Sequence, residues 1–170
     1  MMVYWIGAHA ALGLIIGSFL NVLIIRSYTG KSLSGRSGCL SCGATLHFID
    51  LFPIISWLGL RGRCRYCGSK LSMQYPLVET ATSILFGVVA GAALPFLQHV
   101  LTLTLFSTYI PIVAYDIRHT IIPDAWSAVA ALVAFVTALS SHTLGSNILL
   151  ILASGPLVAL PLWLLWFASR

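Results

Sequence analysis

The residues best suited to chemistry are four cysteines in two C-x2-C pairs, Cys39/Cys42 and Cys64/Cys67, with 21 residues between the pairs. Each second cysteine is followed by glycine, which permits the tight turn that brings backbone N–H groups toward a thiolate. Four thiolates in this pattern suit a structural, tetrahedral Zn²⁺ site, because four cysteines leave no open position for water. The alternative is a pair of C-x2-C disulfides, which are usually redox-active rather than structural.

Carboxylates are the second group of candidates, and the chain has only four: Asp50, Glu79, Asp116 and Asp124. An ionisable residue within a membrane span costs about 2.5–3.5 kcal/mol on insertion scales, so each one there is a functional candidate. Asp116 closes an apolar run and is a functional candidate on this ground. The structural alternative is a polar residue at a span end, paired with Arg118 or His119.

The other polar residues near the apolar runs have structural alternatives of their own. Asp124 follows Pro123 and is predicted to cap the next helix as an N-terminal anion. Glu79 lies about one turn into a span, where it either reaches toward an arginine of the basic loop or anchors a binding pocket near the cysteines. Asn21, inside the first span, is predicted to form a hydrogen bond between helices.

The elements that must position these residues are apolar helices. Hydrophobic residues make up 59% of the 170-residue chain and charged residues 8%, against about 45–50% and about 25% in soluble domains. Five apolar runs approach the length that crosses a bilayer; they cover 3–25, 77–94, 100–115, 125–144 and 148–168. The sequence therefore predicts an all-α integral membrane protein of about five transmembrane helices with a small zinc-ribbon-like insertion. Its domains are a first transmembrane helix (1–26), a four-cysteine domain (27–76) and a four-helix membrane domain (77–170).

Basic residues predict the orientation. All nine lysines and arginines fall on one side of a five-span topology, which the positive-inside rule places in the cytoplasm, with the N-terminus outside. The net charge of +5 is therefore a topology signal rather than a nucleic-acid footprint. A reducing cytoplasm favours zinc over disulfides. The apolar segment 47–60, too short to span, is predicted to lie at the membrane surface.

Four stretches resemble the bacterial prepilin peptidases, also called type IV leader peptidases/N-methyltransferases, of the aspartic peptidase family A24. They are the run from Gly17-Ser-Phe-Leu-Asn21 to Arg26, the two cysteine pairs, 60–68 with 74–79, and 116–124. The resemblance implies an enzyme of the bacterial inner membrane that cleaves the basic leader of type IV prepilins and pseudopilins. It also implies methylation of the new N-terminus by S-adenosylmethionine, with Asp116 as one of two catalytic aspartates.

The sequence departs from this family in one respect. The second aspartate belongs to a Gly-x-Gly-Asp motif, which the 170 residues do not contain. We therefore expect an N-terminal portion of the enzyme, with a C-terminally incomplete membrane domain and no peptidase activity as a monomer. Two alternatives remain: a non-catalytic membrane adaptor whose cysteine knuckles bind a partner in pilus assembly or type II secretion, and a protein that transfers methyl groups without proteolysis.

Overall fold

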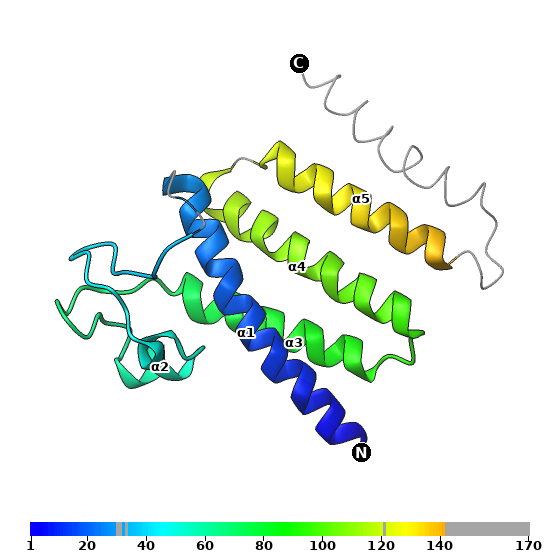
Figure 1. The fold of residues 1–170 in the computed structure, drawn as a ribbon, viewed down its shortest axis with the longest axis horizontal. Helices are drawn as coiled ribbons and strands as arrows, with labels where there is room; N and C mark the ends of the chain where they lie inside the picture. The colour runs from blue at the N-terminus through cyan, green and yellow to red at the C-terminus, as the bar shows by residue number, and fades with distance from the viewer. Residues whose placement is uncertain (30–31, 33, 121, 142–170) are drawn as a thin grey trace.

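The computed structural model describes residues 1–29, 32, 34–120 and 122–141, and the named elements of this part of the chain are helices. Figure 1 shows its elements in chain order: α1 (Met2–Thr29), η1 (Phe48–Leu51), α2 (Ile55–Gly59), α3 (Gln74–Gly91), α4 (Phe96–His119) and α5 (Asp124–Ser141). Strand-like pairing in the described residues is limited to two isolated bridges. The all-α class is confirmed, and the span predicted at 148–168 lies outside the described residues.

Two described helices are long and apolar enough to cross a membrane: the Met2–Ser27 part of α1, and α4. The span predicted at 100–115 was too short, because α4 starts directly after Pro95 and continues through the polar residues 116–119. Thr120 ends α4 in the left-handed conformation, and its N–H donates to the Asp116 carbonyl at 2.7 Å. Asp116 therefore lies in the last turn of α4 rather than beyond it.

Helix α1 crosses α3 at close range, and α4 and α5 complete the bundle (Figure 1). The approach depends on two glycines one turn apart. A Cβ on Gly13 would lie 2.7 Å from the Ser83 Cα, and one on Gly17 would lie 2.7 Å from the Glu79 Cα. This Gly-x-x-x-Gly spacing places both on one helix face, where small residues let two backbones approach. Next to this contact, Leu20, Ile24 and Val78 form a buried hydrophobic cluster.

Gly17→Ala is expected to lower the stability of the bundle by about 1–3 kcal/mol, because the added methyl forces α1 away from α3. Gly7→Ala is the matched control in the same helix, since a Cβ at Gly7 meets nothing within 4 Å. The control should be neutral, or stabilising by up to about 1 kcal/mol through helix propensity. Thermal unfolding in detergent measures both, and equal shifts for the two variants would contradict the close contact.

Candidate functional site

The cysteines occupy two knuckles of the same geometry. In the first, the Cys39 N–H donates to the Ala44 carbonyl at 2.9 Å and the Gly43 N–H returns to the Cys39 carbonyl at 2.9 Å. The second knuckle has the same two hydrogen bonds. The Cys64 N–H donates at 2.8 Å, and the Gly68 N–H donates to the Cys64 carbonyl at 3.0 Å. The two glycines have φ of +72° and +71°, a conformation that a side chain would strain. The glycine after each cysteine pair therefore closes the turn.

The four sulfurs converge on one point. All four Sγ atoms lie within 4.8 Å of one another, and the Cys39 and Cys67 sulfurs are 3.9 Å apart. In a tetrahedral zinc site with Zn–S bonds of about 2.3 Å, the sulfurs would be about 3.8 Å apart. All four thiols are free, so none is joined in a disulfide. The prediction that these cysteines meet is confirmed, and their geometry fits Zn²⁺.

The electrostatics of the cluster favour a cation. The Cys42 backbone N–H lowers the pKa of Cys39 most, burial raises it, and the Ser41 N–H lowers it again, leaving a pKa of about 6. At Cys42 the Ala44 N–H also lowers the pKa, but burial and the neighbouring thiols outweigh it and raise the pKa to about 11. Four thiolates at this separation repel one another, so full ionisation requires a metal at their centre.

Asp50 joins the two halves of the insertion. Its Oδ1 accepts from the Arg65 Nε at 2.7 Å, and its Oδ2 accepts from the His47 N–H at 3.2 Å and the Tyr66 hydroxyl at 3.3 Å. The Asp50 side chain is only 2% exposed. Burial acts to raise its pKa, but the Arg65 guanidinium and the His47 N–H outweigh it and hold the pKa below the ordinary value. Asp50 therefore connects η1 to the second knuckle by hydrogen bonds.

This bond network predicts a pH dependence. Because the folded pKa of Asp50 is lowered, its stabilising effect is present above the unfolded pKa and is lost as the pH falls through the folded pKa. Asp50→Asn should therefore make the insertion easier to unfold near neutral pH, with the difference from wild type shrinking in acid. Urea unfolding between neutral pH and pH of about 3 measures it. Asp124→Asn, at an exposed position, is the control, and a constant difference for Asp50→Asn would contradict the prediction.

Glu79 connects the insertion to the bundle. It is buried one turn into α3, and its Oε2 accepts from the Ile54 N–H at 2.7 Å. It forms no ion pair with an arginine of the described chain. Of the two roles considered from sequence, the geometry corresponds to the polar anchor near the cysteines.

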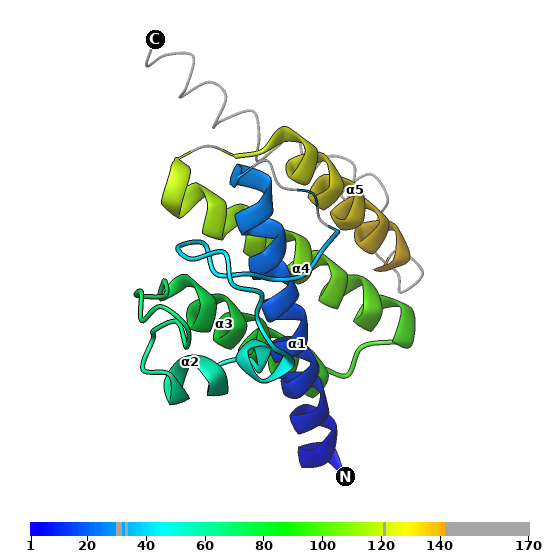
Figure 2. The ribbon, with the colours of Figure 1, turned by 60° about the vertical axis from the view of Figure 1, so that its left-hand side comes forward.

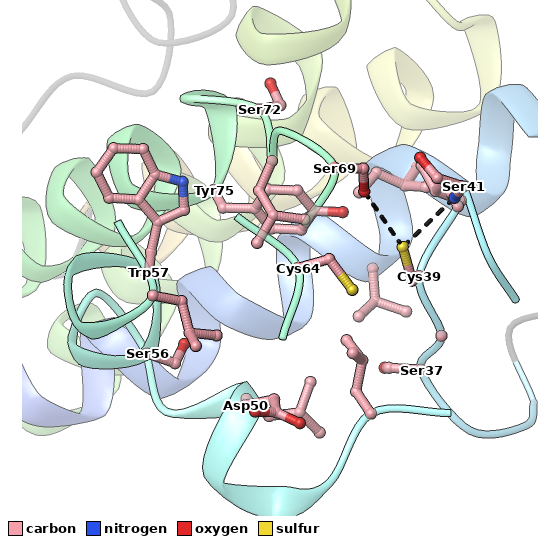
Figure 3. Close-up of a pocket in the computed structure, with 18 of the residues that line it drawn as sticks. Ser37, Cys39, Ser41, Asp50, Ser56, Trp57, Cys64, Ser69, Ser72 and Tyr75 are labelled. Carbon is pink, nitrogen blue, oxygen red and sulfur yellow. Dashed lines mark hydrogen bonds between the residues drawn. The ribbon is translucent and has the colours of Figure 1, made fainter. Parts of the chain in front are cut away.

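A cavity of about 530 Å³ lies between α1, the start of α3 and the insertion (Figure 3). Tyr75 and Trp57 contribute aromatic rings to its wall, while Arg36 and Lys70 contribute positive charge. Figure 3 shows Cys39 and Cys64 among the residues that line this cavity, with hydrogen bonds joining the Cys39 sulfur to the Ser69 hydroxyl and the Ser41 N–H. A volume of this size accommodates a small-molecule cofactor.

A series of side-chain hydrogen bonds joins α4, α3 and α1. Arg118 donates from Nη1 to the Gln74 Oε1 at 2.8 Å, and the Gln74 Nε2 donates to the Asn21 Oδ1 at 3.5 Å. The fully buried Asn21 donates in turn to the Tyr75 carbonyl at 3.1 Å. Asn21 thus forms the predicted bond between helices. The pairing of Gln74 with Arg118 was not predicted from sequence, because no local pattern marks residues 44 apart as partners.

Neither Asp116 nor Asp124 lines this cavity. Asp116 is exposed on the last turn of α4, and within the described part of the chain its carboxylate forms neither of the expected pairs. Asp124 was expected to cap α5 but is the first helical residue. The carbonyl of Pro123 accepts the N–H groups of Trp126 and Ser127, the third and fourth residues of the helix. The Asp124 charge still lies in the first turn, where the helix dipole favours an anion.

Comparison with known proteins identifies the family. A family model described as the bacterial peptidase A24 N-terminal domain matches residues 11–93. The prepilin leader peptidase/N-methyltransferase of Myxococcus xanthus is 42% identical over 113 residues, covering 66% of this chain and 34% of that protein. The Pectobacterium carotovorum protein of the same name is 31% identical over 189 residues, covering 98% of this chain and 67% of the relative.

An Escherichia coli type 4 prepilin-like proteins leader peptide-processing enzyme is 36% identical over 135 residues, covering 68% of this chain and 50% of that enzyme. The chain thus spans about a third to two thirds of the length of these relatives. No solved structure matches. Together with its apolar helices, these matches point to a membrane protein. The chain belongs to the bacterial A24 family of prepilin leader peptidases/N-methyltransferases.

Proposed function

We propose that this chain supplies one catalytic carboxylate and the methyl-donor site of a prepilin leader peptidase/N-methyltransferase. The observation that carries the proposal is the chain of bonds from Arg118 through Gln74 to Asn21. It ties the end of α4 that bears Asp116 to the ends of α1 and α3 that border the cysteine insertion and its cavity. Cleavage and methylation would then occur at one membrane face, on the same peptide terminus.

For cleavage, we propose Asp116 as one of two carboxylates that share a proton. One activates water as a base, and the other polarises the scissile carbonyl as an acid. The other carboxylates of the chain have structural positions: Asp50 holds Arg65, Glu79 holds the Ile54 N–H, and Asp124 lies in the first turn of α5. The partner carboxylate is therefore proposed to come from the family's Gly-x-Gly-Asp motif, which this sequence lacks.

For methylation, the cavity beside the cysteines is the proposed cofactor site. S-adenosylmethionine, when bound, supplies an electrophilic methyl group for the free amine. Arg36 and Lys70 would hold its carboxylate, and the Tyr75 ring would pack on its adenine. The cavity is large enough for such a molecule and carries these groups on its wall, so the residues present fit the cofactor.

The remaining parts of the proposal concern the scaffold. We propose Zn²⁺ as a structural ion on Cys39, Cys42, Cys64 and Cys67, where it would staple an insertion with little core of its own. The insertion faces the cytoplasm of a bacterial inner membrane and the N-terminus lies outside, as the distribution of basic residues indicates. The substrates are prepilins or pseudopilins, presented to the enzyme from the bilayer.

The proposal is tested by supplying the missing carboxylate. The chain is reconstituted with a separately expressed C-terminal segment of a family member chosen for its Gly-x-Gly-Asp motif, and a prepilin is added with S-adenosylmethionine. We expect cleavage only when both parts are present, followed by a mass gain of one methyl group at the new N-terminus. The segment alone is the control. Absence of both products with a properly inserted pair would contradict the proposal.

A methyltransferase that does not cleave is the second candidate. It is favoured by one observation, that Asp116 does not line the cavity beside the cysteines. If this candidate is correct, the chain alone methylates a peptide that already has a free N-terminus. The added segment then produces no cleavage of a prepilin.

A further inference from the structure

The insertion carries an exposed apolar surface that the proposed reactions do not use. Five large side chains of η1, α2 and the link between them are between 43% and 74% exposed. We call them the apolar foot: Phe48, Ile49, Phe52, Ile55 and Leu58. The rings of Phe48 and Phe52 meet edge to face at 5.0 Å. A groove of about 310 Å³ runs between Ile49, Phe52 and Ile55, with Arg65 at its edge. Side chains of this size are seldom gathered in water without a partner.

The fold holds the foot in this exposed arrangement. Ile54 and Arg61 flank α2 with φ of +60° and +51°, conformations that cost about 1–3 kcal/mol each and persist only where the surroundings impose them. At the first of these, the buried Glu79 accepts the Ile54 N–H. Next to Arg61, the Trp57 ring packs closely on Gly62. A Cβ added to Gly62 would lie 2.8 Å from the ring. Both ends of α2 are therefore fixed, and Ile55 and Leu58 are directed outward.

The charges around the foot have one sign. Arg65, which is half exposed, lines the groove of the foot, and the exposed Arg61 lies just beyond the end of α2. The single carboxylate of the insertion, Asp50, is turned inward onto Arg65. An apolar surface with a cationic border and no exposed anion complements the headgroup region of an anionic bilayer.

The position of the foot agrees with this occupant. The bond between Glu79 and Ile54 holds the start of α2 against the second turn of α3. Figures 1 and 2 both show α2 beside the beginning of α3, at the end of the bundle where the insertion lies. The candidate span in α1 ends at Ser27, at this same end. The foot therefore lies beside the bundle at the expected edge of the bilayer.

We propose that the apolar foot docks into anionic phospholipid headgroups of the leaflet on the insertion's side, with its basic border on the phosphates. Together with the bond between Glu79 and Ile54, this contact would set the height of the cysteine cluster and its cavity above the membrane. The proposal depends on the membrane location of the chain and not on its catalytic activity.

Photo-crosslinking tests the proposal. The full chain, with benzoylphenylalanine at Ile55, is reconstituted in nanodiscs of phosphatidylcholine with or without phosphatidylglycerol. Leu40 is the matched control, being an exposed apolar residue of the first knuckle outside the foot. We expect lipid adducts from position 55 several-fold above those from position 40, with a further increase when phosphatidylglycerol is present. Adducts to a second copy of the chain, or equal lipid yields at both positions, would overturn the proposal.

A second variant addresses the consequence for the insertion. Ile55→Glu with Leu58→Glu places two anions in the foot without changing a cysteine or the bond between Glu79 and Ile54. In anionic nanodiscs, we expect protease cleavage within 47–60 to become several-fold faster than in wild type, while bound zinc is retained. Leu40→Glu is the control. Unchanged cleavage with retained zinc would show that the foot does not contact lipid.

Discussion

Cys39→Ser is expected to reduce bound zinc from one ion per chain to near zero and to unfold the insertion. Its sulfur is 3.9 Å from that of Cys67 and receives the Ser41 N–H, so it is both a ligand and a fixed point of the first knuckle. Structural zinc contributes about 10–16 kcal/mol to the folding of small metal-binding domains, and the insertion has little else to replace it. Metal analysis and limited proteolysis of the purified chain measure the two effects.

Ser41→Ala is the matched control for this experiment. Ser41 is exposed, lies between the first two cysteines and contributes its backbone N–H rather than its hydroxyl to the Cys39 sulfur. The control should retain zinc and resist proteolysis as wild type does. A wild-type chain with no metal and four cysteines that resist alkylation would instead indicate disulfides and would reject the zinc site.

Asp116→Asn is expected to abolish prepilin cleavage in the reconstituted pair, with a loss of at least about 10²–10⁴-fold, because the amide cannot exchange a proton with water or with the partner carboxylate. Methylation of a peptide that is already cleaved should remain within about two-fold of wild type, since Asp116 does not line the cavity proposed for the cofactor. Mass spectrometry of the peptide N-terminus follows both reactions in one sample.

The control is Asp124→Asn, which removes the same charge eight residues away. Since Asp124 lies in the first turn of α5, this variant should reduce stability slightly and leave cleavage within a few-fold. Equal losses of cleavage in both variants would assign Asp116 a structural role. A parallel loss of methylation in Asp116→Asn would show that the two reactions share one site.

Several features could be predicted because their cause is local or compositional. The C-x2-C-Gly repeat predicts two turns that present thiolates, and the structure brings the four sulfurs together. The apolar runs predict helices, and α1 and α3 begin and end within a few residues of the predicted spans. The end of α4 was misplaced because polarity was taken as the boundary. The helix in fact continues through Asp116 until Thr120 adopts a left-handed conformation.

The sequence by itself determined the helical class and the cysteine cluster, because both depend on residue type and short spacing, whereas the candidate Asp116 followed from the family resemblance. Only the tertiary structure decided the partners of Glu79, Asp50 and Arg118, which lie 25, 15 and 44 residues away along the chain. The Gly13-x-x-x-Gly17 spacing is visible in the sequence, yet α3 as its partner is not. Polar side chains bond to whatever the packed helices bring within about 3 Å, and that distance is set by the whole bundle rather than by neighbouring residues.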